Sequence, residues 1–285
     1  MLKKLTFILF LTLVIGVNSA ISQEEKTPVE DVFACSMIID NQTPASPMKG
    51  WKEIIIHHRI GTIKSISDLF GIYGPANARL GLNYGVTDKL MLSFGTEKFN
   101  KLQELMWKYS LVKQKENGTP VFVSYVGNFV INARNDEYFG NDYSFTDRFS
   151  YFHQIVIARK FSEKLSLQVA PYFFHFNKVD SLRSNQAVGA NVGGRFKIWN
   201  EVSFIGEFNY TYPLEDITYP TNIDGDDVPG DPKSGFSFGL EKNTGTHALQ
   251  LFATTNNGII PQQSYLFNQR DFSNLLIGFN ITVRI

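Results

Sequence analysis

Five histidines are the first side chains in this 285-residue chain that could hold a metal ion. His57 and His58 are adjacent in a predicted strand, so their side chains point to opposite faces and cannot share one ion. His153 and His175 lie on two runs joined by a turn at residues 162–164. If this turn pairs residues whose numbers sum to about 325, these two histidines also lie on opposite faces, although a shift of one residue would change this. We therefore expect neither a metal site nor a bound cofactor.

A serine hydrolase is the second chemistry that these runs could support. It needs a nucleophilic serine, a histidine within hydrogen-bond reach and a polar group that orients the histidine. Ser150 and His175 are candidates by residue type, and outer-membrane phospholipases are barrels of similar size. The sequence lacks the His-Asp-Ser-Asn-Gly stretch that such a lipase would carry. We predict no enzyme and no catalytic residues, and keep an outer-membrane esterase or phospholipase as the third hypothesis.

The loop NIDGDDVPGDP at residues 222–232 could offer carboxylate oxygens to a calcium ion. Its four aspartates do not follow the spacing of an EF-hand, and no glutamate occupies the twelfth loop position. Asp, Gly and Pro are also the ordinary residues of an exposed loop. The sequence leaves calcium binding open at this loop, and we predict no metal ligands elsewhere.

The amino-terminal residues predict export from the cytoplasm. Two lysines precede an apolar run from Leu5 to Val17, and small or polar residues follow it. The run is shorter than the roughly 20 residues that a helix needs to cross a bilayer. We predict a cleaved signal peptide over residues 1–20. The single cysteine, Cys35, cannot form an internal disulfide.

Acidic and basic residues balance, with 27 of each and no long block of one sign. This composition lacks the electrostatic footprint of a nucleic-acid-binding protein. Aromatic residues make up 14% of the chain, including 25 Phe and 12 Tyr. Because they are spread over many short segments, this composition favours an all-β protein with many strands.

Apolar and polar residues alternate with a period of two along most of the chain. In ANARLGLNYGV at 76–86, Asn77, Arg79 and Asn83 share one face with glycines, and the apolar residues occupy the other. The final residues, 275–285, repeat this pattern. We predict strands near residues 53–63, 76–86, 89–97, 102–113, 120–132, 147–160, 164–176, 186–198, 201–212, 235–243, 246–255 and 274–285.

The connections between these strands are of two kinds. Clearly short turns follow even-numbered strands, and mostly long connections follow odd-numbered ones, with 98–101 as a short exception. Several strands reach about eleven residues, or roughly 36 Å, and a membrane band about 25 Å tall crossed at about 45° needs a similar length. The sequence therefore predicts an antiparallel, up-and-down transmembrane β-barrel of about twelve strands. Both termini lie at its tight, periplasmic rim, and YFFHF at 172–176 joins an aromatic girdle toward the other rim.

Several segments resemble an uncharacterised outer-membrane β-barrel family of Bacteroidota, catalogued as domain of unknown function 5777. They lie at residues 68–90, 148–177, 193–198 and 235–260, in the order that the family has them. The resemblance covers about residues 51–285 and implies an outer-membrane barrel without an established activity. The chain departs from the usual pattern at its last residue, because such barrels commonly end in an aromatic residue and this one ends in Ile285.

The predicted domains are a polar arm at 21–50, either periplasmic or inside the barrel, and an outer-membrane barrel at 51–285. A barrel of this size is intermediate between filled and open ones. We predict a narrow channel for small polar solutes, with a non-conducting structural or assembly component as the alternative. The expected partners are outer-membrane lipid, the barrel assembly machinery and a further membrane protein, with no nucleic acid. The candidate lumen-lining residues are Asn77, Arg79, Asn83, Asn128, Asn191, Arg195, Glu207, Asn280 and Arg284.

Overall fold

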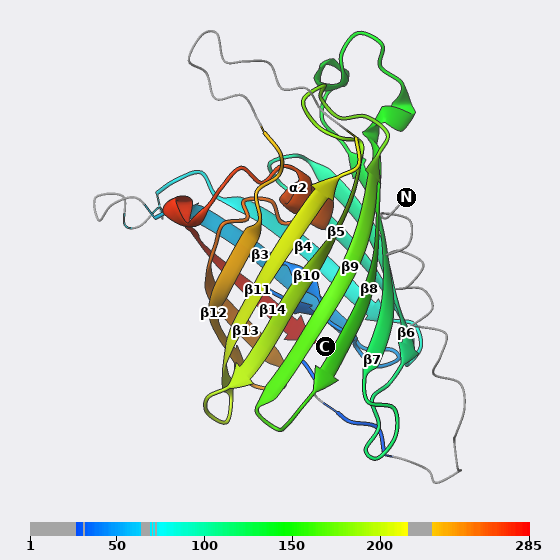
Figure 1. Cartoon of the computed structure of the whole chain (residues 1–285), viewed down its shortest axis with the longest axis vertical. Coiled ribbons are helices and arrows are strands. Elements are labelled where there is room, and N and C mark those ends of the chain that lie inside the picture. The colour runs from blue at the N-terminus through cyan, green and yellow to red at the C-terminus, as the bar shows by residue number, and fades with distance from the viewer. Residues whose placement is uncertain (1–26, 31, 64–68, 70, 72, 216–229) are drawn as a thin grey trace, which may run out of the picture.

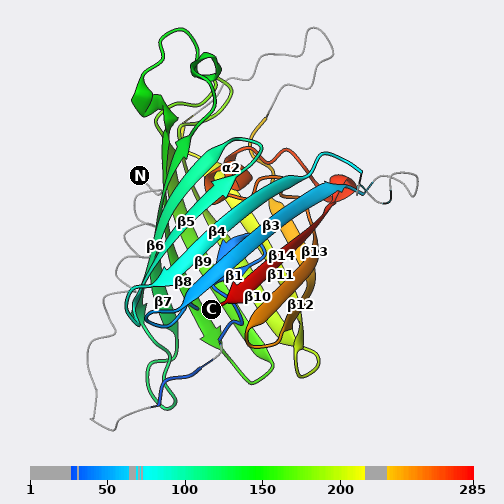
Figure 2. The same cartoon turned by 180° about the vertical axis from the view of Figure 1, so that it is seen from behind.

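Twelve antiparallel strands close into a barrel in the computed structural model, which describes residues 27–30, 32–63, 69, 71, 73–215 and 230–285 (Figures 1 and 2). The last strand pairs with the first barrel strand, so the sheet has no open edge. All twelve predicted strands are present, and their ends lie within two residues of the predicted ones. The barrel strands are β3 (Lys52–Thr62), β4 (Asn77–Gly85), β5 (Leu90–Glu97), β6 (Leu102–Val112), β7 (Phe122–Asn132), β8 (Phe149–Lys160), β9 (Leu165–Phe176), β10 (Gln186–Lys197), β11 (Val202–Pro213), β12 (Gly235–Asn243), β13 (His247–Thr254) and β14 (Leu276–Arg284).

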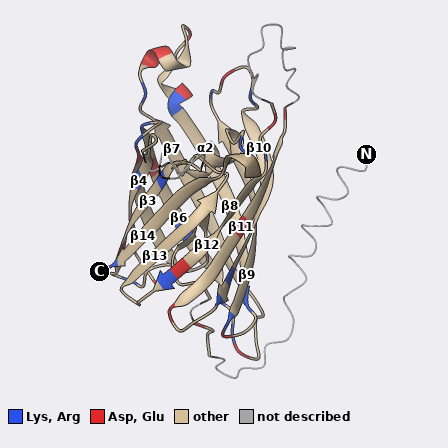
Figure 3. Cartoon of the chain, turned by 90° about the vertical axis from the view of Figure 1, so that its left-hand side faces the viewer, with Lys and Arg blue, Asp and Glu red and all other residues tan. Residues whose placement is uncertain are grey.

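The predicted alternation decides which face of each strand turns inward. In β4 the polar and glycine positions are buried, whereas Leu80, Leu82 and Tyr84 are exposed on the outer surface. Large apolar side chains are exposed on the outer surface of other strands too, for example Phe94 and Leu251. Such a continuous apolar exterior is what a strand wall presents to lipid. In Figure 3 most of this wall is free of charged residues.

The two rims of the barrel differ in the way that the sequence predicts. The tight rim has the connections 86–89, 113–121, 161–164, 198–201 and 244–246, and both β3 and β14 have their free ends there. The looped rim has the connections 63–76, 98–101, 133–148, 177–185, 214–234 and 255–275. Three short helices lie in two of these loops: η2 (Asp136–Phe139), η3 (Phe145–Arg148) and η4 (Phe272–Asn274). A fourth, α2 (Pro261–Leu266), lies across the mouth of the barrel.

The amino-terminal segment forms a small hairpin that is separate from the barrel sheet. Its strands are β1 (Met37–Ile38) and β2 (Asn41–Gln42). Figure 2 shows β1 within the barrel, behind the front strands. Apart from the half-buried Ala34, residues 32–44 are buried throughout, and we call residues 32–45 the plug. The sequence left a periplasmic or a lumenal position open for the arm, and the structure places this part of it in the lumen.

Two predicted features fall on residues that the structure does not describe. The signal peptide at 1–20 lies wholly among them, and so does most of the acidic loop at 222–232. Among the described residues, no helix is both long and apolar enough to cross a membrane.

We predict that Leu82→Arg on the outer face of β4 destabilises the folded barrel in lipid by about 2–4 kcal/mol, because the charge must enter hydrocarbon. Urea titration of the protein in lipid vesicles, followed by its heat-sensitive mobility on gels, measures this loss. Leu214→Arg is the matched control, since Leu214 is similarly exposed but lies in a loop beyond β11. Equal stability of the two variants would show that β4 does not face lipid.

Candidate functional site

The lumen is the candidate site, because it gathers most of the polar side chains that the sequence singled out. All nine predicted lumen-lining residues occupy inward positions on their strands. Seven of them are buried, and Arg195 and Arg284 are partly buried near the tight rim. These side chains do not face an empty pore, because several of them contact the plug or one another.

The tip of the plug hairpin is bonded to the wall through its backbone. Ile39 N donates to Gln250 Oε1 at 3.2 Å, and Asn280 Nδ2 donates to Ile39 O at 2.8 Å. The next peptide group, Asp40 N, donates to Glu207 Oε1 at 3.2 Å. Ile39 has a φ of 47°, which a β-branched residue rarely adopts. The wall contacts on both sides of this turn hold a conformation that the hairpin alone would disfavour.

A buried ion pair between Asp40 of the plug and Arg59 of β3 connects this tip to the wall. Both side chains are almost completely buried. Asp40 Oδ2 also accepts from Asn256 Nδ2 at 3.0 Å, and the Arg59 guanidinium lies 4.7 Å from the centre of the Phe252 ring. Because a buried ion is stable only when paired and hydrogen-bonded, the two charges depend on each other.

Lys108 of β6 holds the base of the hairpin. Its Nζ donates to three plug carbonyls: Ser36 O at 3.0 Å, Thr43 O at 2.8 Å and Ala45 O at 2.7 Å. An ammonium group has three hydrogens, so this geometry satisfies all of them. The side chain is 1% exposed, and it fixes both arms of the hairpin at one point.

Further contacts distribute the plug over much of the wall. Gln154 Nε2 donates to Asn41 Oδ1 at 2.8 Å, and Gln168 Nε2 donates to Gln42 O at 2.9 Å. Nine strands in all bond to the described plug, through Arg59, Asn83, Lys108, Gln154, Gln168, Glu207, Glu241, Gln250 and Asn280. These hydrogen bonds involve both backbone and side chains. The plug also packs against the wall in a buried apolar cluster, which consists of Val32, Phe33, Ile38 and Ile39 with Phe122, Ala158, Ile205 and Phe252.

Other charged residues of the wall pair with one another, and of these Arg284 and Glu241 also contact the plug, at Ala34 O and at the Cys35 thiol. Arg79 Nε donates to Glu104 Oε2 at 2.7 Å, and Asn128 Nδ2 donates to the other oxygen of this carboxylate at 2.5 Å. Gly81 and Gly95 make room for the pair, since a Cβ at either position would lie 2.7 Å from an Arg79 nitrogen. Arg195 pairs with Glu241 at 2.8 Å, and Arg284 with Glu53 at 3.4 Å, both toward the tight rim.

The segment that contains α2 closes the lumen at the looped rim. Tyr265 stacks on Tyr172 of β9 with ring centres 4.8 Å apart, and both pack with Phe152 and Phe174 in one buried cluster. Ile260 packs against two further wall residues. This closure is held by apolar and aromatic contacts, whereas the plug combines apolar packing with many hydrogen bonds and an ion pair.

Cys35 lies in the plug and is buried. Burial raises the pKa of the Cys35 thiol well above its ordinary value, and the nearby Glu241 carboxylate adds to this shift. The neutral thiol is therefore favoured, and it is a poor nucleophile. As the single cysteine of the chain, it can report on whether the plug is in place.

The register between β8 and β9 corrects one prediction. Residues pair with numbers that sum to 326, so His153 lies opposite Phe173 and His175 opposite Tyr151. Because this differs by one residue from the predicted register, both histidines face outward and not to opposite sides. His175 stacks with Tyr151 on the outer surface, with ring centres 6.2 Å apart. The strand pattern places Ser150 inward, so Ser150 and His175 lie on opposite faces and do not form a hydrolase pair.

His57 and His58 lie on opposite faces, as the sequence predicts. His57 is buried in the lumen, with Nδ1 3.3 Å from Arg79 Nη1. His58 stacks on Phe279 outside, with ring centres 4.8 Å apart.

Several residues of the site were not among the nine predicted ones. Glu104 and Lys108 alternate with apolar residues along β6, so the same period-two pattern could have identified them. Arg59 lies in β3, which is otherwise rich in isoleucine, and it occupies a buried position in the same period-two pattern. Asp40 lies in the arm, where no local pattern indicates that it meets Arg59.

The sequence profile of a family described as a membrane-bound β-barrel domain, DUF5777, matches residues 33–284. The chain belongs to this family. The match begins within the plug, so nearly all of the plug is part of the family's domain and not an addition to it. Comparison with curated proteins gives no significant match.

Solved porin structures are similar to this DUF5777 member at very low sequence identity. The NanC porin is 8% identical, with a TM-score of 0.51, over 81% of this chain and 98% of the porin. The KdgM porin is 8% identical, with a TM-score of 0.46, over 82% and 97%. OmpF of Salmonella typhi is 7% identical, with a TM-score of 0.39, over 82% and 96%. The likeness to the NanC porin shows a shared fold.

We predict that Lys108→Met increases the rate at which a maleimide labels Cys35 by at least about tenfold. The substitution removes the three hydrogen bonds that the charged Lys108 donates to the plug, each worth about 1.5–3 kcal/mol. Mass spectrometry of the folded protein in detergent measures the rate. Labelling of the unsubstituted protein should be slow and should rise with pH, since the raised pKa keeps the thiol protonated.

Lys89→Met is the matched control, because Lys89 is exposed in a tight turn. It should leave the labelling rate unchanged. Equal rates in the Lys108 and Lys89 variants would mean that Lys108 does not hold the plug.

Proposed function

We propose that this protein is a channel of the outer membrane for small polar solutes, and that its own plug closes it in the described state. The observation that carries this proposal is the set of hydrogen bonds and the ion pair between plug and wall, which accompany an apolar cluster at Phe122, Ala158, Ile205 and Phe252. The polar contacts can be exchanged for water, and the wall that remains is lined mainly by polar side chains.

The charges of the wall bear on the class of solute. Arg79 with Glu104, Arg195 with Glu241 and Arg284 with Glu53 present both signs side by side. A lumen of this kind has no strong field of one sign, which favours uncharged polar solutes over multiply charged ions. Fold alone does not fix function, so the shared fold of the NanC porin is only consistent with this proposal.

Opening requires a change at both ends of the lumen. The plug closes the part toward the tight rim through hydrogen bonds, an ion pair and an apolar cluster, whereas Ile260 and Tyr265 close the looped mouth through apolar and aromatic contacts. Two closures of different chemistry would respond to different signals. The proposed location assigns the tight rim to the periplasm, with export by a cleaved signal peptide and insertion by the barrel assembly machinery.

The second candidate is a non-conducting structural or assembly component. The observation in its favour is the extent of the plug's attachment, which reaches nine strands of the wall. In that case the filled lumen stiffens the barrel, and a membrane-protein partner binds its rims. An esterase remains the third candidate, but no described Ser–His pair supports it.

We predict that a mature chain that starts at Pro47 and carries Ile260→Ser and Tyr265→Ser, which weaken the closure at the looped mouth, conducts small ions in planar bilayers. The full mature chain with the same two substitutions should be closed by its plug nearly all the time. The shortened chain keeps every barrel strand, because β3 begins at Lys52. A chain starting at Val32 with the same two substitutions is the matched control, because it keeps the plug and should stay closed. Liposome swelling with a neutral sugar then tests passage of uncharged solutes.

The folded state of each chain is checked by heat-sensitive mobility on gels. A chain starting at Pro47 with the two substitutions that folds and inserts but never conducts would contradict the channel proposal and favour the structural role. Steady conductance by the full mature chain would contradict closure by the plug.

A further inference from the structure

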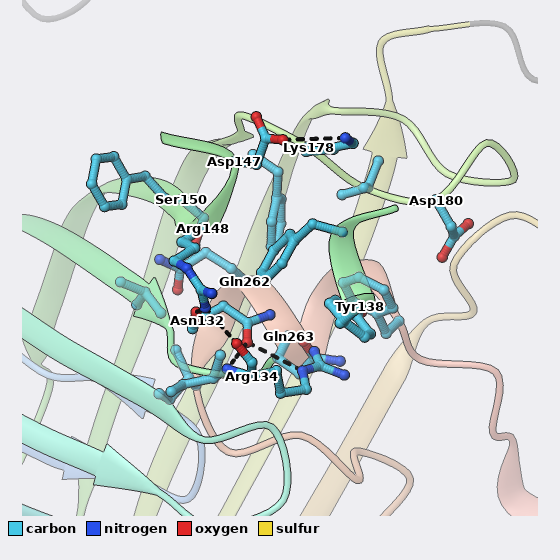
Figure 4. A pocket seen from close by; sticks show the side chains of 18 of the residues that line it. Asn132, Arg134, Tyr138, Asp147, Arg148, Ser150, Lys178, Asp180, Gln262 and Gln263 are labelled. Carbon is cyan, nitrogen blue, oxygen red and sulfur yellow. Dashed lines mark hydrogen bonds and ion pairs between the residues drawn. The ribbon is translucent and has the colours of Figure 1, made fainter. Parts of the chain in front are cut away.

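A cavity of about 330 Å³ opens at the looped rim, between α2 and the loops at 133–148 and 177–185 (Figure 4). Its volume lies at the small end of the range for pockets that bind small molecules. The cavity is distinct from the plug contacts, since no plug residue lines it.

Gln262 of α2 is the first sign that this cavity is made for a ligand. Its side chain lines the cavity and is 1% exposed, yet neither its Nε2 nor its Oε1 has a hydrogen-bond partner in the described protein. Leaving a buried amide unpaired costs about 1–3 kcal/mol for each polar group. A ligand with a hydrogen-bonding group would satisfy it.

Arg134 supplies the charge of the cavity. Its backbone N and its Nε donate to Asn132 Oδ1 at 3.1 and 3.2 Å, and its guanidinium lies 3.5 Å from the centre of the Tyr138 ring. No described acidic residue forms an ion pair with it. The two Nη groups therefore remain available for a carboxylate, which a guanidinium binds in a planar, bidentate geometry.

The other charged residues around the cavity are already paired. Arg148 forms an ion pair with Asp136 and donates to two backbone carbonyls, and Lys178 pairs with Asp147 at 3.1 Å. Asp180 pairs with Arg183. Among the described lining residues, Arg134 is thus the one cation without an acidic partner.

Aromatic and aliphatic side chains form most of the remaining lining. Phe176 and Phe267 meet edge to face with ring centres 5.9 Å apart, and Phe149 contacts Phe129 at 5.2 Å. Leu102, Val130 and Ile260 form a buried apolar cluster beside them. Such a surface accepts a flat apolar body and excludes a fully hydrated ion.

We propose that this cavity binds a small organic acid that has an apolar ring and at least one further hydrogen-bonding group. Arg134 binds the carboxylate, the amide of Gln262 bonds to the polar group, and the phenylalanines contact the ring. The site goes beyond the proposed channel, because it requires only the folded barrel and α2. Its ligand could reach it from the side of the looped rim.

The three isomers of hydroxybenzoate are suitable probes, with the three hydroxybenzamides as uncharged counterparts. Equilibrium dialysis or calorimetry with the full mature protein in detergent measures their binding. We expect saturable binding of at least one hydroxybenzoate, at least about tenfold tighter than its amide, since one charge-assisted contact is lost. Arg134→Gln should remove this preference for the acid, and Gln262→Leu should weaken both compounds of the pair.

Arg159→Gln is the matched control, because Arg159 is exposed at the far end of β8. It should bind as the unsubstituted protein does. Saturable binding that Arg134→Gln leaves unchanged would overturn the proposal, and so would the absence of binding for all six compounds at millimolar concentration. Failure of conductance in the plug experiments would not affect these results, so the two proposals fail separately.

Discussion

The pairing of β14 with β3 is the interaction on which the rest of the structure depends. Within lipid, each backbone N–H and C=O must find a partner in the protein, so a sheet can span the membrane only when it closes on itself. Eight residue pairs, from Leu276–Thr62 to Arg284–Glu53, join these two strands. Closure then fixes an inside and an outside, and the period of two assigns every side chain to one or the other.

The inside creates a second requirement, which the plug fulfils. Inward residues such as Arg59, Lys108 and Glu207 are polar, and the barrel gives many of them no wall partner of opposite charge. Asp40 neutralises Arg59, and three plug carbonyls surround the Lys108 ammonium. The hairpin in turn depends on the wall, since Ile39 at its tip adopts a backbone conformation that such residues rarely take. The plug therefore satisfies polar groups of the wall, and the wall stabilises the conformation of the plug.

Most of the barrel could be predicted from the sequence, because the faces of its strands and the lengths of its connections follow from residues that are close together in the chain. Alternation along β4 and β14 identified their inward faces, and the lengths of the connections identified the two rims. The register of β8 and β9 could not be fixed in this way, since a shift of one residue at the 161–164 turn decides whether His153 and His175 lie on the same face or on opposite faces. The position of the plug was beyond local patterns too. Asp40 and Arg59 are close in sequence, but their pairing depends on where the whole arm enters the barrel.

The hydrogen bonds and the ion pair that hold the plug, beside its apolar cluster, make its attachment depend on the exclusion of water. Removing one partner of a buried ion pair from a dry interior costs about 3–5 kcal/mol, because the other charge stays unpaired. When the hairpin leaves a lumen that fills with water, however, Asp40 and Arg59 are both hydrated, and so are Lys108 and the carbonyls that it held. The plug can therefore be firmly held while water is excluded and become removable once water enters. The apolar contacts of Ile260 and Tyr265 at the looped rim limit the access of water to the plug from that side.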